Sequence, residues 1–289
     1  MNMYQPSSPF DFPVEIVDGS SFRIFDENGL EMNVPSGKHQ AVIRSDTRDV
    51  LAIHGGSYKL TPHSEVADAA MDAIRASGLA LEEARIRDRV YDNGAKMLRT
   101  VSFPTITTQP RVGDIVEFEI VLRNSYDGSW RYGMSAGARR LICLNGMTLP
   151  SGMDVSTSQR HTRKIDTSSE SQKISNALDA FQDAEGIWHT WSGLRCTKED
   201  VQELWAGTLA HSPSPSAPDK VNGRLMDRLI DGWNKESWNL GPTPWAAYNV
   251  ATSWASHSET KGKVHEARKR RHEAVDAMIN SPKWLEMVS

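Results

Sequence analysis

The sequence predicts an α+β fold, with an antiparallel β-meander and a packed helix in the N-terminal half and a helical C-terminal half. Three observations carry this prediction. Residues 85–144 alternate apolar and polar side chains with period two, between turn signals at 92–94 and 127–128. Residues 61–78 carry one amphipathic helical stripe. Beyond about residue 165, apolar side chains recur at three- and four-residue spacing, which is typical of helices.

The first 60 residues have the pattern of short strands separated by glycine-containing turns. The helix expected at residues 61–78 begins near Thr61 or Ser64, either of which is a suitable N-cap residue, and Gly78 suits its end. Its predicted buried stripe consists of Val66, Ala69, Ala70, Ala73 and Ile74.

Four strands are expected in the meander. The runs ARIRDRVY and AKMLRTVSF flank Asp92-Asn93-Gly94, which favours a hairpin because a tight turn between strands needs positive φ angles. The run DIVEFEIVLRNS alternates with period two, and SWRYGMSAGARRLICL follows the turn at residues 127–128. These runs predict consecutive antiparallel strands.

The C-terminal half contains five helical patterns. They cover residues 168–184, 197–209, 219–235, 243–258 and 263–280. Thr197 and Asp200 have the spacing of a capping box. The segment HSPSPSAP, residues 211–218, has the composition of a linker. We therefore expect one domain over residues 1–164, with a basic antiparallel sheet, and a helical region over residues 165–289.

Composition places the chain among ordinary globular proteins. Of its 289 residues, 38% are hydrophobic and 24% are charged. No apolar run approaches the roughly 20 residues that span a bilayer, so no membrane partner is expected. The N-terminal residues lack the pattern of a secretion signal. Cys143 and Cys196 form no CxxC motif, which favours a reducing cytosol.

Charge is distributed unevenly along the chain. The net charge of the whole sequence is −4, yet residues 85–164 carry 13 Lys and Arg against 7 Asp and Glu. A concentrated positive charge of this kind attracts an anionic partner even when the chain as a whole is acidic.

The first basic group lies on one predicted strand. Arg85, Arg87, Arg89 and Tyr91 all point to the same face of that strand, because side chains alternate. Their spacing of about 7 Å is close to the phosphate spacing of an extended nucleic-acid strand, and a tyrosine can stack on a base. The alternative is a solvated face on which Asp88 or Asp92 balances the arginines.

The second basic group is the doublet Arg139-Arg140. Adjacent strand residues point to opposite faces, so one arginine faces the core, where an unpaired charge is very costly. The doublet therefore needs an anionic partner, either Glu117 and Glu119 or a phosphate. A third group, with Arg160, Arg163 and Lys164, is expected in a loop. The run ARKRR at residues 267–271 is typical of a solvated helix face, and His272 is expected to be solvated with it.

Catalytic motifs give little support to an enzyme. The sequence lacks the GxSxG, GxxxxGK[ST] and GxGxxG patterns, and its histidines form no HExxH motif. No cofactor or metal is expected. One enzymatic alternative is a metal-dependent nuclease, because Asp114, Glu117 and Glu119 lie on or beside one strand and two of them could share a cation. No lysine follows at the spacing common in such nucleases.

Several segments together resemble a known family. The segments lie between about residues 39 and 260, and they are AVIRSDTRDVLAI, YKLTPHSEV, LRNSYDGS, RRLICLNGM, RHT and TPWAAYNVATSWASH. They resemble the phage/plasmid-like protein family, whose uncharacterised members are carried by bacteriophages, prophages and plasmids. The resemblance implies a mobile genetic element in a bacterial cytoplasm and no settled activity.

A second resemblance concerns the fold alone. The order helix, basic antiparallel meander, helix looks like the core of single-strand annealing recombinases, which form rings or filaments and hold single-stranded DNA in a basic groove. Fold likeness does not establish function. With the charge pattern, it gives the hypothesis of a single-stranded-DNA-binding, annealing-type recombination protein that forms a homo-oligomer larger than a dimer.

The expected DNA-binding residues of this hypothesis are Arg85, Arg87, Arg89, Tyr91, Arg139, Arg140, Arg160, Arg163 and Lys164. The alternative to it is a protein-binding factor that inhibits a host defence or replication protein, followed by the nuclease.

Overall fold

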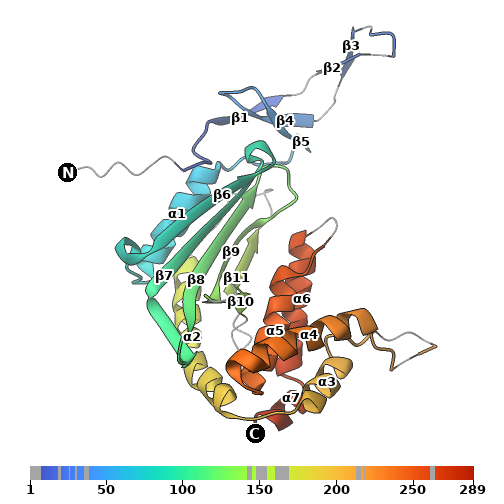
Figure 1. Cartoon of the computed structure of the whole chain (residues 1–289). Helices are drawn as coiled ribbons and strands as arrows, with labels where there is room; N and C mark the ends of the chain where they lie inside the picture. Colours follow the sequence, from blue (N-terminus) through green and yellow to red (C-terminus); the bar gives the residue numbers. More distant parts are fainter. Residues whose placement is uncertain are drawn as a thin grey trace. The chain divides into compact units, whose positions relative to one another are not determined.

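The computed structural model of the chain combines antiparallel sheets with helices, which confirms the predicted α+β class (Figure 1). It describes residues 8–18, 21–25, 27–29, 31–35, 39–141, 145–147, 155–159, 169–212, 216–217, 219–260 and 264–289.

The chain divides into two compact units whose segments interleave along the sequence. The first unit contains Met1–Ser102, Ile120–Ala136 and Val155–Ser175, and the second contains Phe103–Glu119, Gly137–Asp154 and Asn176–Ser289. The domain boundary expected near residue 164 stays a prediction.

The N-terminal strands form two small sheets. Strands β1 (Val14–Asp18), β4 (His39–Arg44) and β5 (Val50–Gly55) form an antiparallel sheet in the order β1-β4-β5, and β2 (Ser21–Phe25) pairs with β3 (Glu31–Pro35). Residues of the three-stranded sheet contribute to a buried hydrophobic cluster, which consists of Val42, Leu51, Tyr58, Ala95 and Tyr126.

A six-stranded sheet carries the predicted meander. Its strands are β6 (Arg85–Tyr91), β7 (Lys96–Arg111), β8 (Asp114–Ser125), β9 (Tyr132–Arg140), β10 (Asn145–Met147) and β11 (Val155–Gln159). The order is β10-β9-β8-β7-β6, and β11 also pairs with β9. The four expected strands are confirmed. Strand β6 lies at one edge, with β7 as its only neighbour in the sheet as described.

The predicted hairpin between β6 and β7 is confirmed. Its pairs run from Arg85 opposite Ser102 to Tyr91 opposite Lys96. Three successive residues of the loop have positive φ angles, and the last of them, Gly94, has a φ of 95°. A Cβ atom there would lie 2.5 Å from Cζ of Phe12, so both the backbone and the packing require glycine.

The two faces of the sheet differ in burial. On the inner face, Met97, Val101, Ile120, Leu122 and Met134 are almost completely buried. The alternate residues point to the opposite face, which we call the outer face, where most side chains are partly or fully exposed. Residues that pair across antiparallel strands share a face. The outer face in the first unit therefore includes Arg85, Arg87, Arg89, Tyr91, Lys96, Leu98, Thr100, Val121, Arg123 and Ser125.

Helix α1 (His63–Ala76) packs against the inner face, and Val66, Ala70, Ala73 and Ile74 of the predicted stripe are buried. Ala69 is only partly buried, whereas Ala67 and Met71 are buried as well. The expected N-cap at Thr61 or Ser64 is wrong, because Pro62 is the N-cap residue and makes no side-chain cap bond. Instead, the backbone N–H of His63 donates to the hydroxyl of Tyr126 at 2.8 Å. A distant side chain thus satisfies a first-turn donor.

Six further helices follow the sheet, and the predicted capping box on the second of them is confirmed. They are α2 (Glu170–Gly193), α3 (Lys198–Gly207), α4 (Gly223–Leu240), α5 (Pro244–His257), α6 (Val264–Ile279) and α7 (Pro282–Met287). Thr197 N–H donates to Asp200 Oδ2 at 2.8 Å, and Asp200 N–H donates to Thr197 Oγ1 at 3.1 Å. In the described part of the chain, no helix combines the length and the apolar character needed to cross a membrane.

Tryptophan side chains form much of the core of the second unit. Trp188 and Trp245 are fully buried, with ring centroids 5.8 Å apart, and the ring of Trp191 lies 4.8 Å from that of Trp284. Trp238 on α4 does not contribute to this core, because 89% of it is exposed.

Helix α6 is only partly the solvated face that its sequence suggests. Arg271 Nε donates to the carbonyl of Ala255 at 3.0 Å, and its Nη1 donates to Thr260 Oγ1 at 2.9 Å. His272 is half-buried, with Nε2 3.4 Å from Ser256 Oγ. The expectation that Arg271 and His272 are solvated is wrong, because both side chains contact the end of α5.

We expect His272 to make the protein less stable in mild acid. Burial, together with the charges of Arg268 and Arg271, lowers the pKa of His272 from 6.5 to about 4. Between these two values the unfolded chain binds a proton that the folded chain does not, so stability falls as the pH falls. His272→Gln should reduce the loss of unfolding free energy between pH 7 and pH 4.5 by about 2–3 kcal/mol in urea titrations. Equal losses in the variant and the wild type would contradict this.

Candidate nucleic-acid interface

The arginine row, Arg85, Arg87 and Arg89, lies exposed on the outer face of the edge strand β6. Consecutive members are about 7 Å apart because same-face residues are separated by two strand steps. Among the residues that the structure describes, none of the three guanidinium groups has a carboxylate within ion-pair distance.

The two aspartates that could have balanced the row pair elsewhere. Asp88 points to the inner face, where its carboxylate accepts from Arg99 Nε at 2.8 Å. Asp92 in the hairpin loop accepts from Lys96 Nζ at 2.5 Å. The row therefore keeps its positive charge.

An aromatic pair lies at the end of the row. Tyr91 is 39% exposed, and its ring lies 5.9 Å from that of Trp130 at an interplanar angle of 67°. Lys96 Nζ lies 5.8 Å from the centroid of the Trp130 ring. Sequence analysis identified Tyr91 but missed Trp130. The available signal was that Trp130 is the single tryptophan outside the C-terminal helical region.

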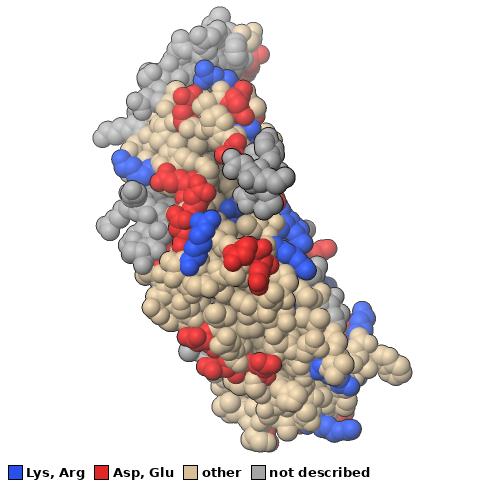
Figure 2. Space-filling view, turned by 90° about the vertical axis from the view of Figure 1, so that its left-hand side faces the viewer, with Lys and Arg blue, Asp and Glu red and all other residues tan. Residues whose placement is uncertain are grey.

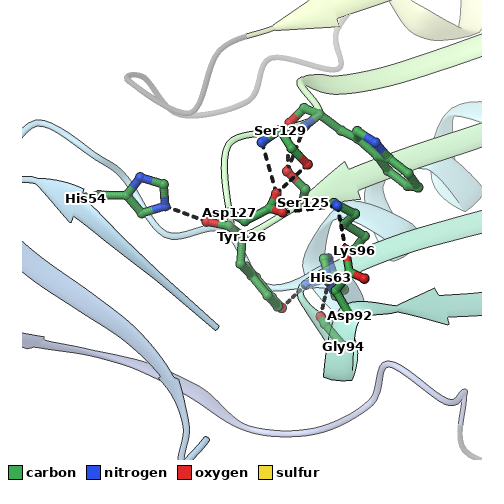
Figure 3. A network of polar contacts seen from close by, with 10 residues as sticks. His54, His63, Asp92, Gly94, Lys96, Ser125, Tyr126, Asp127 and Ser129 are labelled. Atoms are coloured by element: carbon green, nitrogen blue, oxygen red, sulfur yellow. Dashed lines mark hydrogen bonds and ion pairs between the residues drawn. The ribbon is translucent and has the colours of Figure 1, made fainter. Parts of the chain in front are cut away.

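The segment NSYDGS, residues 124–129, builds a hydrogen-bonded turn (Figure 3) that directly precedes Trp130. Ser125 Oγ donates to the carbonyl of Trp130 at 2.9 Å and accepts from its N–H at 3.0 Å. Asp127 accepts from the backbone N–H of Ser129 at 2.9 Å and lies 3.3 Å from Lys96 Nζ. Burial disfavours the carboxylate of Asp127, but bonds from Ser129 and Ser125 and the charge of Lys96 outweigh it and lower the pKa of Asp127.

The same segment fastens the turn to α1 and to the N-terminal sheet (Figure 3). His63 is fully buried, and its ring stacks on Tyr126 with centroids 3.9 Å apart. Its Nδ1 lies 3.0 Å from Asn124 Nδ2, which donates, so Nε2 carries the proton and donates to the carbonyl of Gly94 at 3.0 Å. His54 Nε2 donates to the carbonyl of Tyr126 at 2.5 Å. The segment thus fixes the turn before Trp130 through contacts with α1 and the N-terminal sheet.

Arg140 lies in the core of the second unit. It is 1% exposed, its Nε donates to Asp114 Oδ1 at 2.5 Å, and its Nη1 donates to Glu236 Oε2 at 3.0 Å. Trp245 Nε1 donates to the other oxygen of Asp114 at 2.6 Å. The partners of Arg140 are therefore carboxylates, but they are Asp114 and Glu236 and not the Glu117 and Glu119 considered from the sequence.

Arg139 points to the outer face and lies among carboxylates as well. Its Nε is 2.9 Å from Glu119 Oε2, and its Nη2 is 3.3 Å from Glu117 Oε2. Both doublet arginines therefore have carboxylate partners inside the second unit.

The carboxylates considered for nuclease chemistry do not converge. Asp114 binds Arg140 on the inner face, whereas Glu117 and Glu119 lie on the outer face with Arg139 between them. Within the described residues, no group of three His, Cys, Asp or Glu side chains is placed to hold a metal ion.

The third expected basic group, Arg160, Arg163 and Lys164, lies outside the described residues. On the face drawn in Figure 2, the coloured basic side chains lie beside acidic ones and do not form one continuous area. On this face, the described residues offer no uniformly basic area to an anionic chain.

The fold and the site define an α+β protein with a basic and aromatic patch on the outer face of an antiparallel sheet. Residues 50–279 match the family described as a domain of unknown function (DUF932), and this match covers most of the chain. The chain belongs to that family. Comparisons with curated proteins and with solved structures gave no match.

Proposed function

We propose that the protein binds single-stranded DNA through the outer face of its six-stranded sheet, as an annealing-type recombination protein of a phage or plasmid in a bacterial host cytoplasm. We propose, too, that it acts as a homo-oligomer larger than a dimer. The observation that carries the proposal is the arginine row, which has no carboxylate partners among the described residues and ends at the exposed Tyr91 and the partly buried Trp130.

Single strands suit this arrangement for two physical reasons. The evenly spaced arginines of β6 can each contact a phosphate of an extended single strand, because both repeats are about 7 Å. Unpaired bases expose their faces, so a base can stack on Tyr91 or Trp130, as sequence-tolerant single-strand binders do. In a duplex the bases stack on one another, and the aromatic pair would then contribute nothing.

A second candidate function follows from the position of β6. Its outer edge has no neighbouring strand in the sheet as described, so it presents backbone groups that a strand of a partner protein can pair with. This observation favours the protein-binding alternative, a factor that inhibits a host defence or replication protein. In that case the arginines prevent β6 from pairing with copies of the same chain, and the protein does not bind DNA.

Replacing Tyr91 with Ala tests the proposal. Loss of one stacking platform should weaken binding of labelled oligo(dT), measured by fluorescence anisotropy at about 50 mM salt, by roughly 1–3 kcal/mol, or 5- to 150-fold in Kd. Trp238→Ala is the matched control, because it removes an exposed aromatic ring far along the chain, on α4. The control should bind like the wild type, and duplex DNA of equal length should bind less tightly.

Three results would contradict the proposal. They are the absence of oligo(dT) binding by the wild type, equal affinity of Tyr91→Ala and the wild type, and a preference for duplex DNA. Light scattering of the same samples, with and without oligonucleotide, measures the assembly. A monomer in both conditions would contradict the proposed oligomer.

A further inference from the structure

Arg123 on β8 differs from the other buried or half-buried arginines of the sheet. Arg99 pairs with Asp88, Arg139 with Glu117 and Glu119, and Arg140 with Asp114 and Glu236. Arg123 is half-buried on the outer face, and within the described part of the chain its side chain makes no hydrogen bond or ion pair.

The strand register places Arg123 across the sheet from the arginine row. Tyr126 N–H donates to the carbonyl of Ala95 at 2.7 Å, which aligns the two strands at that pair. Leu98 lies three residues after Ala95 on β7, and Arg123 lies three residues before Tyr126 on β8, so Arg123 and Leu98 are opposite each other. Leu98 is also the partner of Arg89 on β6.

A ring contact supports this alignment independently. The same register places Phe103 opposite Phe118, and the centroids of these two rings are 5.9 Å apart. Arg89 and Arg123 therefore flank Leu98 on the outer face, with backbones about 10 Å apart, which is two strand spacings. Two arginine side chains at this separation can converge on one anion above the leucine.

A half-buried guanidinium without a partner is unfavourable. Partial removal from water weakens its hydration, and no carboxylate compensates. Burial accordingly lowers the pKa of Arg123, with no acidic neighbour opposing the effect. A bound anion would supply the missing partner, and a planar guanidinium matches the oxygens of a phosphate group better than a point charge does.

We propose that Arg89 and Arg123 form an oxyanion-binding site above Leu98 that takes a phosphate group. This inference rests on the proposed function for the identity of its biological ligand, and it deepens that function. It assigns one backbone phosphate of the single-stranded DNA to a fixed position on the sheet. Arg123 then binds the DNA on the outer face of the sheet, while the arginine row contacts further phosphates of the same DNA strand along β6.

Inorganic phosphate serves as the probe, with thermal unfolding as the readout. In the wild type, phosphate should raise the Tm in a saturable manner above a chloride control of equal ionic strength, by about 2–4 °C at tenfold excess over Kd. Arg123→Gln and Arg89→Gln should each lose the saturable part. Arg228→Gln, at an exposed position on α4, should keep it.

A measurement without phosphate separates binding from folding. Arg123→Gln should then be at least as stable as the wild type, because it removes a half-buried charge that has no partner. An equal phosphate effect in all four proteins, or a marked loss of stability of Arg123→Gln in phosphate-free chloride buffer, would overturn the proposal.

The failure of this site and the failure of the proposed function are distinguishable. If oligo(dT) binds but Arg123→Gln changes neither its affinity nor the phosphate effect, the oxyanion site is wrong and the proposed function stands. If phosphate binds in an Arg123-dependent manner but no oligonucleotide binds, the site stands and single-stranded DNA is not its ligand.

Discussion

Arg140→Ala is expected to lower the free energy of unfolding by about 3–5 kcal/mol, because it removes one partner of a buried ion pair. Among the described side chains, Asp114, which is 2% exposed, would be left with the indole N–H of Trp245 as its donor. Glu236 would lose the same partner. Urea unfolding at pH 7, followed by tryptophan fluorescence, measures the loss.

Two comparisons make this result specific. Arg75→Ala breaks an exposed pair with Asp72 and should change stability by no more than about 1 kcal/mol. The double variant Arg140→Met with Asp114→Asn should recover part of the loss, because it leaves no unpaired charge at Asp114. A cost below about 1 kcal/mol for Arg140→Ala would show that the buried network does not support the fold.

This prediction affects how DNA-binding data are interpreted. Arg140 was expected from the sequence to contact DNA, and its burial with Asp114 gives it a structural role in the second unit. Weaker DNA binding by an Arg140 variant would therefore reflect loss of folding, unless the variant melts like the wild type.

Local patterns were sufficient to predict the parts of the fold that depend on neighbouring residues. Period-two alternation and the turn at residues 92–94 located β6 and β7, and the spacing of Thr197 and Asp200 located the start of α3. In each case the interacting groups lie within a few residues of one another, so the sequence contains the whole interaction.

Long-range partners could not be predicted in the same way. The cap of α1 comes from Tyr126, 63 residues after His63, and one partner of Arg140 is Glu236, 96 residues away. No residue spacing encodes such contacts, because they depend on how elements pack. Sequence alternation did place Arg139 and Arg140 on opposite faces, but the choice between a carboxylate and a phosphate required the packed structure.

In the candidate site, too, neighbours along one strand could be predicted from the sequence, whereas neighbours across strands could not. Alternation along β6 was enough to place Arg85, Arg87, Arg89 and Tyr91 on one exposed face. Trp130 joins them through a loop, and Arg123 joins them through the register of two other strand pairs. Cross-strand neighbours of this kind become visible only when the alignment of the strands is known.

Removal of the arginine row is expected to have the largest effect on DNA binding. The triple variant Arg85→Gln, Arg87→Gln and Arg89→Gln keeps polar side chains and removes three cations at exposed positions, so folding should be preserved. Each lost phosphate contact reduces the release of counterions, which controls the salt dependence of binding. The matched control replaces Arg224, Arg228 and Lys235, three exposed cations on α4, with glutamine.

The salt dependence of oligo(dT) binding by these three proteins tests the central claim most directly. If the row holds phosphates, the slope of log K against log salt should be shallower by about 2 in the row variant, at about 0.7 per contact, and unchanged in the control. Its affinity at low salt should fall accordingly, with thermal melting like that of the wild type. Equal slopes for the row variant and the wild type, or an equal reduction in both triple variants, would contradict the claim that this face of the sheet binds single-stranded DNA.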